Sequence, residues 1–170
     1  MTVYVGLLRA VNVGGTGKLP MVTLRAICED AGFTGVATYI ASGNVVFESK
    51  EASANVKSAL EKRLRDYAGK PVCVMIRTAA EMAAILKGNP FATVEANRTV
   101  AIFLDMTPPA NGLEAISGRV DEETALGVRE IYVHYPRGQG RSKLRIPAAA
   151  AGTARNMNTV AKLAEMAVRY

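Results

Sequence analysis

Residues 36–48, with the sequence VATYIASGNVVFE, decide the fold. The β-branched and aromatic residues at 36–41 and again at 45–48 are typical of strands. Ser42-Gly43-Asn44 between them has the residue types that tight turns prefer, because glycine and asparagine tolerate a left-handed backbone. The stretch therefore predicts a β-hairpin, and the elements on either side of this hairpin decide the fold class.

A strand and a helix are predicted on each side of the hairpin. Before it, the apolar run at 3–8 predicts a buried strand, and apolar residues at helical spacing predict an amphipathic helix over 20–31. After it, a second such helix is predicted over 52–68 and a strand over 72–76. The inward-facing residues of this second helix are Val56, Leu60, Leu64 and Tyr67. The resulting order, βαββαβ, is that of a ferredoxin-like unit.

The second half of the chain predicts a similar order of elements. We expect a helix over 79–87, strands over 99–104, 119–127 and 130–135, short helices over 108–117 and 142–151, and a final helix that runs to the C-terminus. The fold class is therefore α+β, with two ferredoxin-like subdomains of the βαββα type that have antiparallel sheets, plus a C-terminal helix. The expected boundaries are 1–87 for the first subdomain, 88–98 for a linker and 99–170 for the second subdomain, and the two can also form one compact structural domain.

The net positive charge lies in the last quarter of the chain. Residues 1–130 contain 14 Lys and Arg and 14 Asp and Glu, whereas residues 131–170 contain seven basic residues and one acidic residue, which together give the net charge of +6. Residues 1–28 contain three basic residues and no acidic residue. Two stretches so poor in acidic residues favour an anionic partner, although a solvated basic face is equally compatible with them.

The sequence carries no signal for a membrane. No apolar run approaches the roughly 20 residues that a membrane-spanning helix needs. No basic segment precedes the first apolar run, so we interpret this run as a strand and not as a signal peptide. Cys28 and Cys73 are the two cysteines, and both stand in apolar surroundings. Two buried, reduced thiols are expected, and the predicted location is cytoplasmic.

The Gly-rich loop from Arg9 to Lys18 follows the first strand and precedes a helix. Its glycines allow backbone N–H groups to approach an anion, and the start of a helix adds a positive field. The phosphate-binding P-loop pattern does not fit, since Gly17-Lys18 would require glycine at position 12 and Ser or Thr at position 19. The dinucleotide-binding pattern does not fit either, because its last glycine is missing. Anion binding and a flexible connection both remain open.

A second polar motif, residues 152–160 with the sequence GTARNMNTV, precedes the apolar residues of the final helix. One interpretation is helix capping, with Asn156 or Asn158 satisfying the first N–H groups and Arg155 paired with an acidic residue elsewhere. The other is a polar pocket in which Arg155 forks onto a phosphate or carboxylate. Five polar residues are more than capping requires, so we keep the pocket hypothesis and expect this motif to meet the loop at 9–18.

Several separated motifs of the chain agree with one set of known sequences. They are residues 7–15 (LLRAVNVGG) with 18–21, residues 38–47 (TYIASGNVVF), residues 141–144 (RSKL) and residues 152–160. In this order and spacing the motifs resemble the domain of unknown function 1697 family, a family of bacterial proteins. Two residues depart from its pattern, since Ala10 stands where the family often has glycine and Met157 where it often has tryptophan. The resemblance implies an α+β protein of about this length, and it supplies no activity.

The residues that carry common enzyme chemistry are not grouped in this sequence. His134 is the only histidine, and with two scattered cysteines it cannot form a zinc cluster. A G-x-S-x-G motif is absent, and the run Asp121-Glu122-Glu123 is typical of a solvated segment. We therefore predict no catalytic residue, no metal site and no cofactor, and whether the protein is an enzyme stays open.

The hypothesis that we rank first is a cytosolic protein that binds a small anionic ligand, which bears a phosphate or a carboxylate and can be nucleotide-like. The alternatives are a nucleic-acid-binding protein, which the basic C-terminal stretch favours, and an enzyme that acts on an anionic metabolite. No membrane partner is expected, and the oligomeric state stays open.

The predicted ligand site combines the two polar loops with the hairpin turn. The turn alone explains Ser42 and Asn44, and the sequence does not place this turn relative to the loop at 9–18. The predicted ligand-binding residues are Arg9, Asn12, Gly14, Gly15, Lys18, Ser42, Asn44, Ser142, Lys143, Thr153, Arg155, Asn156, Asn158 and Thr159.

Overall fold

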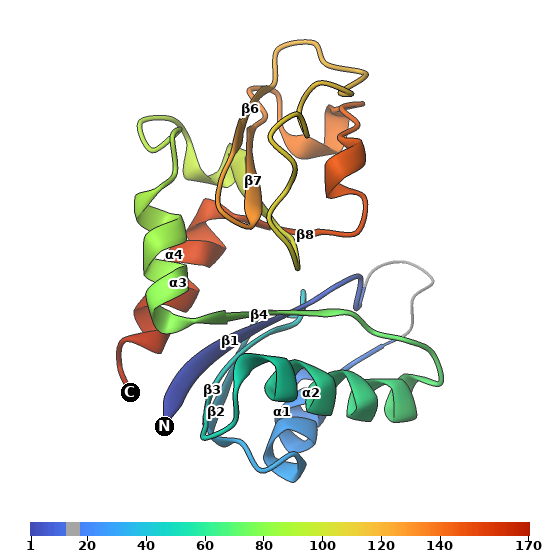
Figure 1. Ribbon diagram of the computed structural model, residues 1–170, viewed down its shortest axis with the longest axis vertical. Coiled ribbons are helices and arrows are strands. Elements are labelled where there is room, and N and C mark those ends of the chain that lie inside the picture. Colours follow the sequence, from blue (N-terminus) through green and yellow to red (C-terminus); the bar gives the residue numbers. More distant parts are fainter. Residues whose placement is uncertain (13–17) are drawn as a thin grey trace. The chain divides into compact units, whose positions relative to one another are not determined.

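The structure is a computed structural model, and it describes residues 1–12 and 18–170. Within these residues the chain has an α+β fold with two four-stranded antiparallel sheets, as the sequence predicts (Figure 1). The chain divides into two compact units: Met1–Ala83 together with Leu163–Tyr170 form the first, and Ala84–Lys162 form the second. Each unit contains one of the two sheets.

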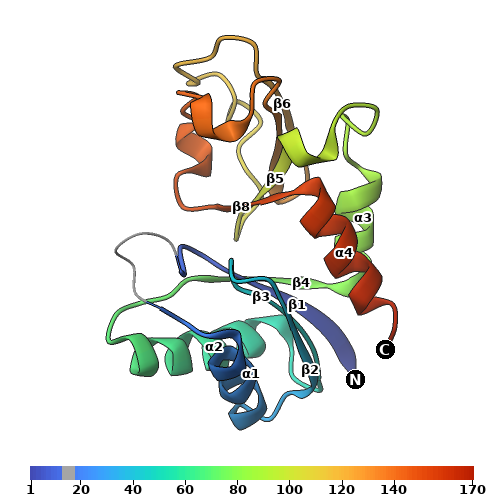
Figure 2. The same ribbon diagram turned by 180° about the vertical axis from the view of Figure 1, so that it is seen from behind.

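The first unit has the predicted element order βαββαβ. Its elements are β1 (Thr2–Leu8), α1 (Met21–Asp30), β2 (Thr34–Tyr39), β3 (Asn44–Ser49), α2 (Ser53–Ala68) and β4 (Val74–Thr78). The strands are ordered β2-β3-β1-β4, and α1 and α2 cover the same face of the sheet (Figure 1 and Figure 2). Leu7 pairs with Asn44 and Leu8 with Val74, so the end of β1 lies beside the starts of β3 and β4.

The core of the first unit lies between the sheet and its two helices. The buried residues of α2 are Val56, Leu60 and Leu64, which have the helical spacing seen in the sequence. From the sheet side, Phe47 stacks on Phe33 with ring centroids 4.3 Å apart. The prediction that Tyr67 faces inward is wrong. Tyr67 stands in the last turn of α2, next to an open cavity, and 50% of it is exposed.

The second unit, all of whose residues the structure describes, repeats the strand order of the first. Its strands are β5 (Thr99–Phe103), β6 (Glu123–Leu126), β7 (Glu130–His134) and β8 (Thr153–Asn156). They are ordered β6-β7-β5-β8, so counted along the chain both sheets run second, third, first, fourth. Apolar residues of the connecting segments, such as Leu113 and Leu144, pack on the buried cluster around Val100 and Ile131. Loops therefore supply here the cover that helices supply in the first unit.

Two predictions for the second unit are wrong, and one of its strands was not predicted. Residues 108–117 form turns and not a helix, because two consecutive prolines and an Asn-Gly pair favour turns. Residues 142–151 contain only the short 3₁₀ helix Pro147–Ala149, since the proline interrupts a longer helix. β8 was not predicted, because its sequence Thr-Ala-Arg-Asn lacks an apolar run. Two further 3₁₀ helices are Ala96–Arg98 and Gln139–Arg141.

The remaining helices are α3 (Ala79–Lys87) and α4 (Met157–Ala167). Asn156 caps α4, since its Oδ1 accepts the backbone N–H of Thr159 at 2.9 Å, which confirms the capping interpretation for this residue. After α4, the hydroxyl of Tyr170 lies within hydrogen-bonding distance of the carbonyl oxygens of Gly35 and Val46. The C-terminal residue is thereby attached to β2 and β3 of the first unit.

The two cysteines differ in their surroundings. Neither is in a disulfide; Cys28 is buried and Cys73 is partly exposed, so the expectation of a buried thiol holds only for Cys28. Burial raises the pKa of the Cys28 thiol from its ordinary value of 9.0 to about 12, and the nearby Glu29 carboxylate adds to this effect. Above pH 9.0 the unfolded chain loses this proton while the folded chain keeps it. Stability is therefore expected to fall as the pH rises from 9.0 towards about 12.

This alkaline loss of stability can be assigned to one thiol. Between about pH 8.5 and about pH 10, the free energy of unfolding of the native protein should fall by about 1 kcal/mol more than that of Cys28→Ala. Urea unfolding at the two pH values measures the difference. Cys73→Ala is the matched control and should keep the native pH dependence, because it retains Cys28. Parallel curves for the native protein and Cys28→Ala would contradict the raised pKa.

Candidate functional site

The loop after β1 and the turn between β2 and β3 meet at the side chain of Asn12. Its Nδ2 donates to the carbonyl oxygens of Leu19 and Ala41, both at 2.8 Å. Its Oδ1 accepts the backbone N–H of Leu19 at 2.6 Å. The side-chain amide of Asn12 thus joins the start of the β1–α1 connection to its end, and it joins both to the hairpin turn. The sequence alone does not predict this contact.

The hairpin turn itself is held by its own polar residues. Asn44 is fully buried, and its Nδ2 donates to the carbonyl oxygen of Tyr39 and to Oγ of Ser42, both at 2.9 Å. The backbone N–H of Leu8 donates to the carbonyl oxygen of Gly43 at 2.8 Å, which continues the pairing of β1 beyond its ladder with β3. Ser42 and Asn44 therefore shape the turn, and their contact with a ligand stays a prediction.

Backbone strain is concentrated in the same two segments. Among the residues that the structure describes, three residues other than glycine have a positive φ: Ala10 at 56°, Asn12 at 56° and Ile40 at 50°. This region costs roughly 1–2 kcal/mol for an L-residue with a Cβ atom. Glycine would adopt the left-handed backbone at residue 10 without this cost. Strain of this kind is often retained at functional sites, so it directs attention to this end of the first unit.

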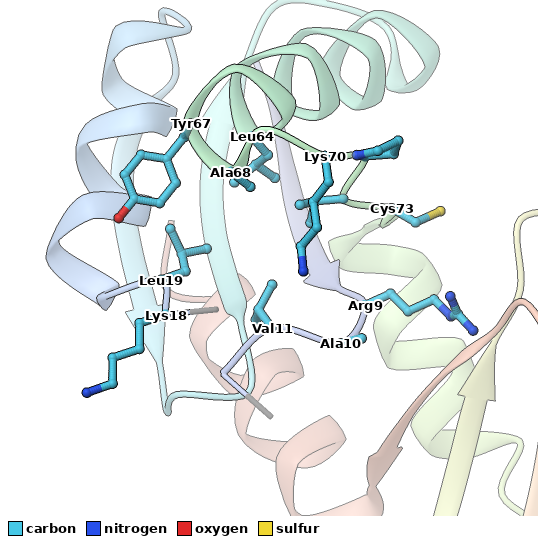
Figure 3. Close-up of a pocket in the computed structure, with 12 residues that line it drawn as sticks. Arg9, Ala10, Val11, Lys18, Leu19, Leu64, Tyr67, Ala68, Lys70 and Cys73 are labelled. Carbon is cyan, nitrogen blue, oxygen red and sulfur yellow. The ribbon is translucent and has the colours of Figure 1, made fainter. Parts of the chain in front are cut away.

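A cavity of about 340 Å³ opens beside this loop (Figure 3). Three basic residues from separate segments line it: Arg9 after β1, Lys18 before α1 and Lys70 after α2. None of the described residues that line the cavity is acidic. The buried side chains of Val11, Leu19 and Leu64 also line it. The cavity thus combines a positive charge with an apolar wall.

The folding of the first unit brings these cations to one end of the sheet. Gly69 ends α2 in the left-handed conformation, with φ of 71°, and its N–H donates to the carbonyl oxygen of Arg65 at 2.8 Å. The chain then turns towards β4, so Lys70 follows the helix end directly. The N–H of Arg9 donates to the carbonyl oxygen of Cys73 at 2.9 Å, which extends the β1–β4 pairing past both strands. Arg9 and Lys70 are therefore held on adjacent segments.

Sequence reasoning found Arg9 and Lys18 but missed Lys70, Tyr67 and Cys73 of the same cavity. A lysine after a helix end is usually solvated, and a tyrosine at helical spacing is usually part of the core. The predicted βαββαβ order could have indicated that Lys70 and Cys73, which precede the fourth strand, lie near Arg9. In the antiparallel β1–β4 pair, the residues after the first strand and before the fourth strand lie at the same end of the sheet.

Ser142 and Lys143 line a second cavity, of about 460 Å³, in the second unit. Oγ of Ser142 donates to Oε1 of Glu122 at 3.1 Å, and the N–H of Val120 donates to Oε2 at 2.9 Å. The amide of Val120 is the main cause of the lowered pKa of Glu122, and the Ser142 hydroxyl adds to it. Asp121 forms an ion pair with Arg137 at 3.0 Å. Two carboxylates, those of Asp121 and Glu122, therefore offset part of the positive charge of this cavity, unlike in the first.

The polar motif at 152–160 is largely used by the structure of the second unit. Arg155 lies on β8 and is 7% exposed, and its Nη1 donates to Oγ1 of Thr153 at 2.7 Å and to the carbonyl oxygen of Ala154 at 3.0 Å. Burial lowers the pKa of Arg155 to about 10. Thr159 is buried, whereas Asn158 is exposed. These contacts account for most of the polar residues of the motif, and ligand binding by them stays a prediction.

Some predicted relations lie beyond what the structure describes. Gly14 and Gly15 lie outside the described residues. The loop at 9–18 belongs to the first unit and the motif at 152–160 to the second, so the single site that would combine them stays a prediction. Within residues 1–12 and 18–170, no group of three or more His, Cys, Asp or Glu side chains is placed to hold a metal ion. No helix in that part of the chain has both the length and the hydropathy needed to cross a bilayer.

Comparisons with known proteins identify a family model and a similar solved structure. A family model described as "Protein of unknown function (DUF1697)" matches residues 1–132. A solved structure, that of the conserved bacterial protein SP0830 from Streptococcus pneumoniae, is similar with a TM-score of 0.78 and 24% sequence identity, over 98% of each chain. At this identity the similarity supports the fold alone. Among curated proteins, none matches this chain.

Proposed function

Because the chain belongs to the DUF1697 family, whose description names no activity, we propose a function from the chemistry of the site: the protein binds a small ligand that bears a phosphate or a carboxylate. The observation that carries this proposal is the cavity of the first unit. Arg9, Lys18 and Lys70 line its volume of about 340 Å³, and none of the described lining residues is acidic. The resemblance inferred from the sequence motifs is confirmed by the family match.

The arrangement of the cations supports an anionic ligand. Figure 3 shows the Lys70 side chain directed into the middle of the cavity, with Arg9 to one side of it. A guanidinium can donate two parallel hydrogen bonds to a phosphate or carboxylate, and an ammonium adds a compact charge. A concave wall of apolar side chains strengthens their combined field, because water is partly excluded there. The three cations themselves are exposed, so a ligand would reach them from solvent.

Thermal unfolding in the presence of candidate ligands tests the proposal. The panel contains inorganic phosphate, sugar phosphates, nucleotides, carboxylates and short oligonucleotides. A ligand at 100 times its dissociation constant stabilises the folded state by about 2.7 kcal/mol, which shifts the midpoint by roughly 5–10 °C for a chain of this size. A shift with one class of anion would identify the ligand chemistry, and no shift with any anion would contradict the proposal.

Removal of the cavity cations should weaken this binding. We expect about tenfold weaker affinity for Arg9→Gln and for Lys70→Gln, and about 100-fold for the double variant, because a hydrogen bond to a charged group contributes about 1.5–3 kcal/mol. Isothermal titration calorimetry at fixed salt measures the change. Lys50→Gln is the matched control, since Lys50 follows the end of β3 that pairs with the start of β1, at the opposite end of the sheet. An equal loss in Lys50→Gln would indicate general electrostatic attraction and no defined site.

The same titrations separate the proposed function from its alternatives. Nucleic-acid binding would strengthen with strand length and weaken steeply with salt. An enzyme would convert the ligand, which product analysis after incubation would detect. The cytoplasmic location stays a prediction.

A further inference from the structure

The cavity of the first unit has two chemically different sides. In Figure 3 the side chains of Tyr67 and Leu19 lie on one side of Lys70, and those of Arg9 and Cys73 lie on the other. Leu64 and Leu19 are 1% and 5% exposed, so they form a fixed apolar wall next to the ring of Tyr67. Arg9 lies across Lys70 from this wall, and the third lining cation, Lys18, lies beside Leu19 with its side chain directed away from Lys70. The cavity is therefore amphipathic.

Tyr67 is the unusual residue of this wall. It continues the stripe of α2 in which Leu60 and Leu64 are buried, yet 50% of it is exposed. An aromatic ring that lines a cavity and stays half exposed offers a flat face to a ligand. Stacking of a base on such a ring contributes roughly 1–3 kcal/mol and does not depend on the identity of the base.

The volume of the cavity suits a ligand with one ring system and one anionic group. Pockets for small molecules range over roughly 300–1,000 Å³, and this cavity of about 340 Å³ lies at the lower end. A dinucleotide or a large coenzyme would exceed it. Inorganic phosphate would use only the basic side and leave the apolar wall in contact with water.

We propose that the ligand is an anion that carries a flat ring, of the size of a nucleoside monophosphate, with the ring against Tyr67, Leu64 and Leu19 and the anionic group bound by Arg9 and Lys70. This inference rests on the proposed function and makes it more specific. A nucleoside monophosphate and a simple aromatic phosphate share the required chemistry, and the experiment separates these two sources.

Calorimetry with five probes tests the inference: inorganic phosphate, ribose 5-phosphate, adenosine 5′-monophosphate, adenosine and phenyl phosphate. Adenosine 5′-monophosphate should bind about tenfold tighter than ribose 5-phosphate, because only the former has a flat aromatic base to stack. Tyr67→Ala should reduce this ratio to about one. Tyr67→Phe is the matched control and should keep the ratio. Tighter binding of adenosine 5′-monophosphate than of phenyl phosphate would identify a nucleoside ligand, and equal binding would identify the aromatic anion as the recognised feature.

The outcomes distinguish this inference from the proposed function on which it rests. Equal affinity for adenosine 5′-monophosphate and ribose 5-phosphate, or a ratio that survives in Tyr67→Ala, would overturn the role of the ring and leave anion binding intact. Arg9→Gln should weaken ribose 5-phosphate and adenosine 5′-monophosphate by the same factor. A failure of all the phosphate-bearing probes to bind would overturn this inference, and it would overturn the proposed function as well if the carboxylates of the thermal-unfolding panel also gave no shift. Because Tyr67 is half exposed, Tyr67→Ala is expected to fold, and its far-ultraviolet circular dichroism spectrum checks this.

Discussion

Asn12→Ala is expected to lower the free energy of unfolding by about 4 kcal/mol. The substitution removes three hydrogen bonds, two to the carbonyl oxygens of Leu19 and Ala41 and one from the N–H of Leu19. Each bond contributes roughly 1 kcal/mol, and alanine adds a further penalty of about 1 kcal/mol because residue 12 has a φ of 56°, which asparagine tolerates better. Urea unfolding measures the loss.

Asn55→Ala is the matched control for this prediction. Asn55 lies on the surface of α2 in the same unit, where its Nδ2 donates only to the exposed carboxylate of Glu51, at 3.3 Å. Alanine also has the higher helix propensity, so this variant should stay within about 0.5 kcal/mol of the native protein. If the two variants lost the same stability, the amide of Asn12 would not be the connection between the loop and the hairpin turn.

Asn12→Ala is expected to weaken ligand binding at the proposed site as well as to lower the stability of the fold. Arg9 and Lys18 stand on the two ends of the connection that the amide closes. Without this closure the two cations lose their fixed separation, and ordering them again would oppose ligand binding. The affinity for anions should therefore fall in Asn12→Ala although Asn12 does not line the cavity, which assigns it a positioning role.

The first unit could be predicted from the sequence because its signals are local. Runs of β-branched, aromatic and apolar residues identified each strand of the βαββαβ order, and helical spacing of apolar residues identified each helix. In the second unit the sheet is covered by loops, so residues such as Leu113 and Leu144 are buried without any periodicity. Their burial depends on the tertiary fold, and a helix at 108–117 was inferred where prolines favour turns.

The candidate site was only partly predictable for the same reason. Residue types identified Arg9 and Lys18, which lie in a Gly-rich loop. Lys70 becomes significant only because β1 and β4 are adjacent in the sheet, a non-local pairing. At Arg155 the number of polar residues favoured a pocket, and ligand binding there stays a prediction. In the folded chain Thr153 and the carbonyl of Ala154 accept from its guanidinium, and Asn156 caps α4.

Alanine substitutions at Gly43, in the hairpin turn, and at Gly32 separate the destabilisation caused by overpacking from that caused by backbone strain. Gly43 and Gly32 share a φ of 88°, so alanine suffers the same conformational penalty of roughly 1–2 kcal/mol at both positions. A Cβ atom at position 43 would lie 2.6 Å from Cγ2 of Val11 and 2.9 Å from Cβ of Leu8, whereas at position 32 it would meet nothing within 4 Å. The variants Gly43→Ala and Gly32→Ala therefore differ mainly in overpacking.

Gly43→Ala is expected to lose about 4 kcal/mol of stability and Gly32→Ala about 1 kcal/mol, since overpacking adds about 1–3 kcal/mol to the backbone strain. Urea unfolding of the two variants gives the difference directly. Val11 also lines the cavity, so its displacement by the new methyl group should reduce the affinity for anions in Gly43→Ala and leave it unchanged in Gly32→Ala. Equal losses of stability would mean that the loop and the turn do not pack tightly. If Gly43→Ala lost more stability than Gly32→Ala but kept its affinity for anions, the packing of the turn would not determine the shape of the cavity.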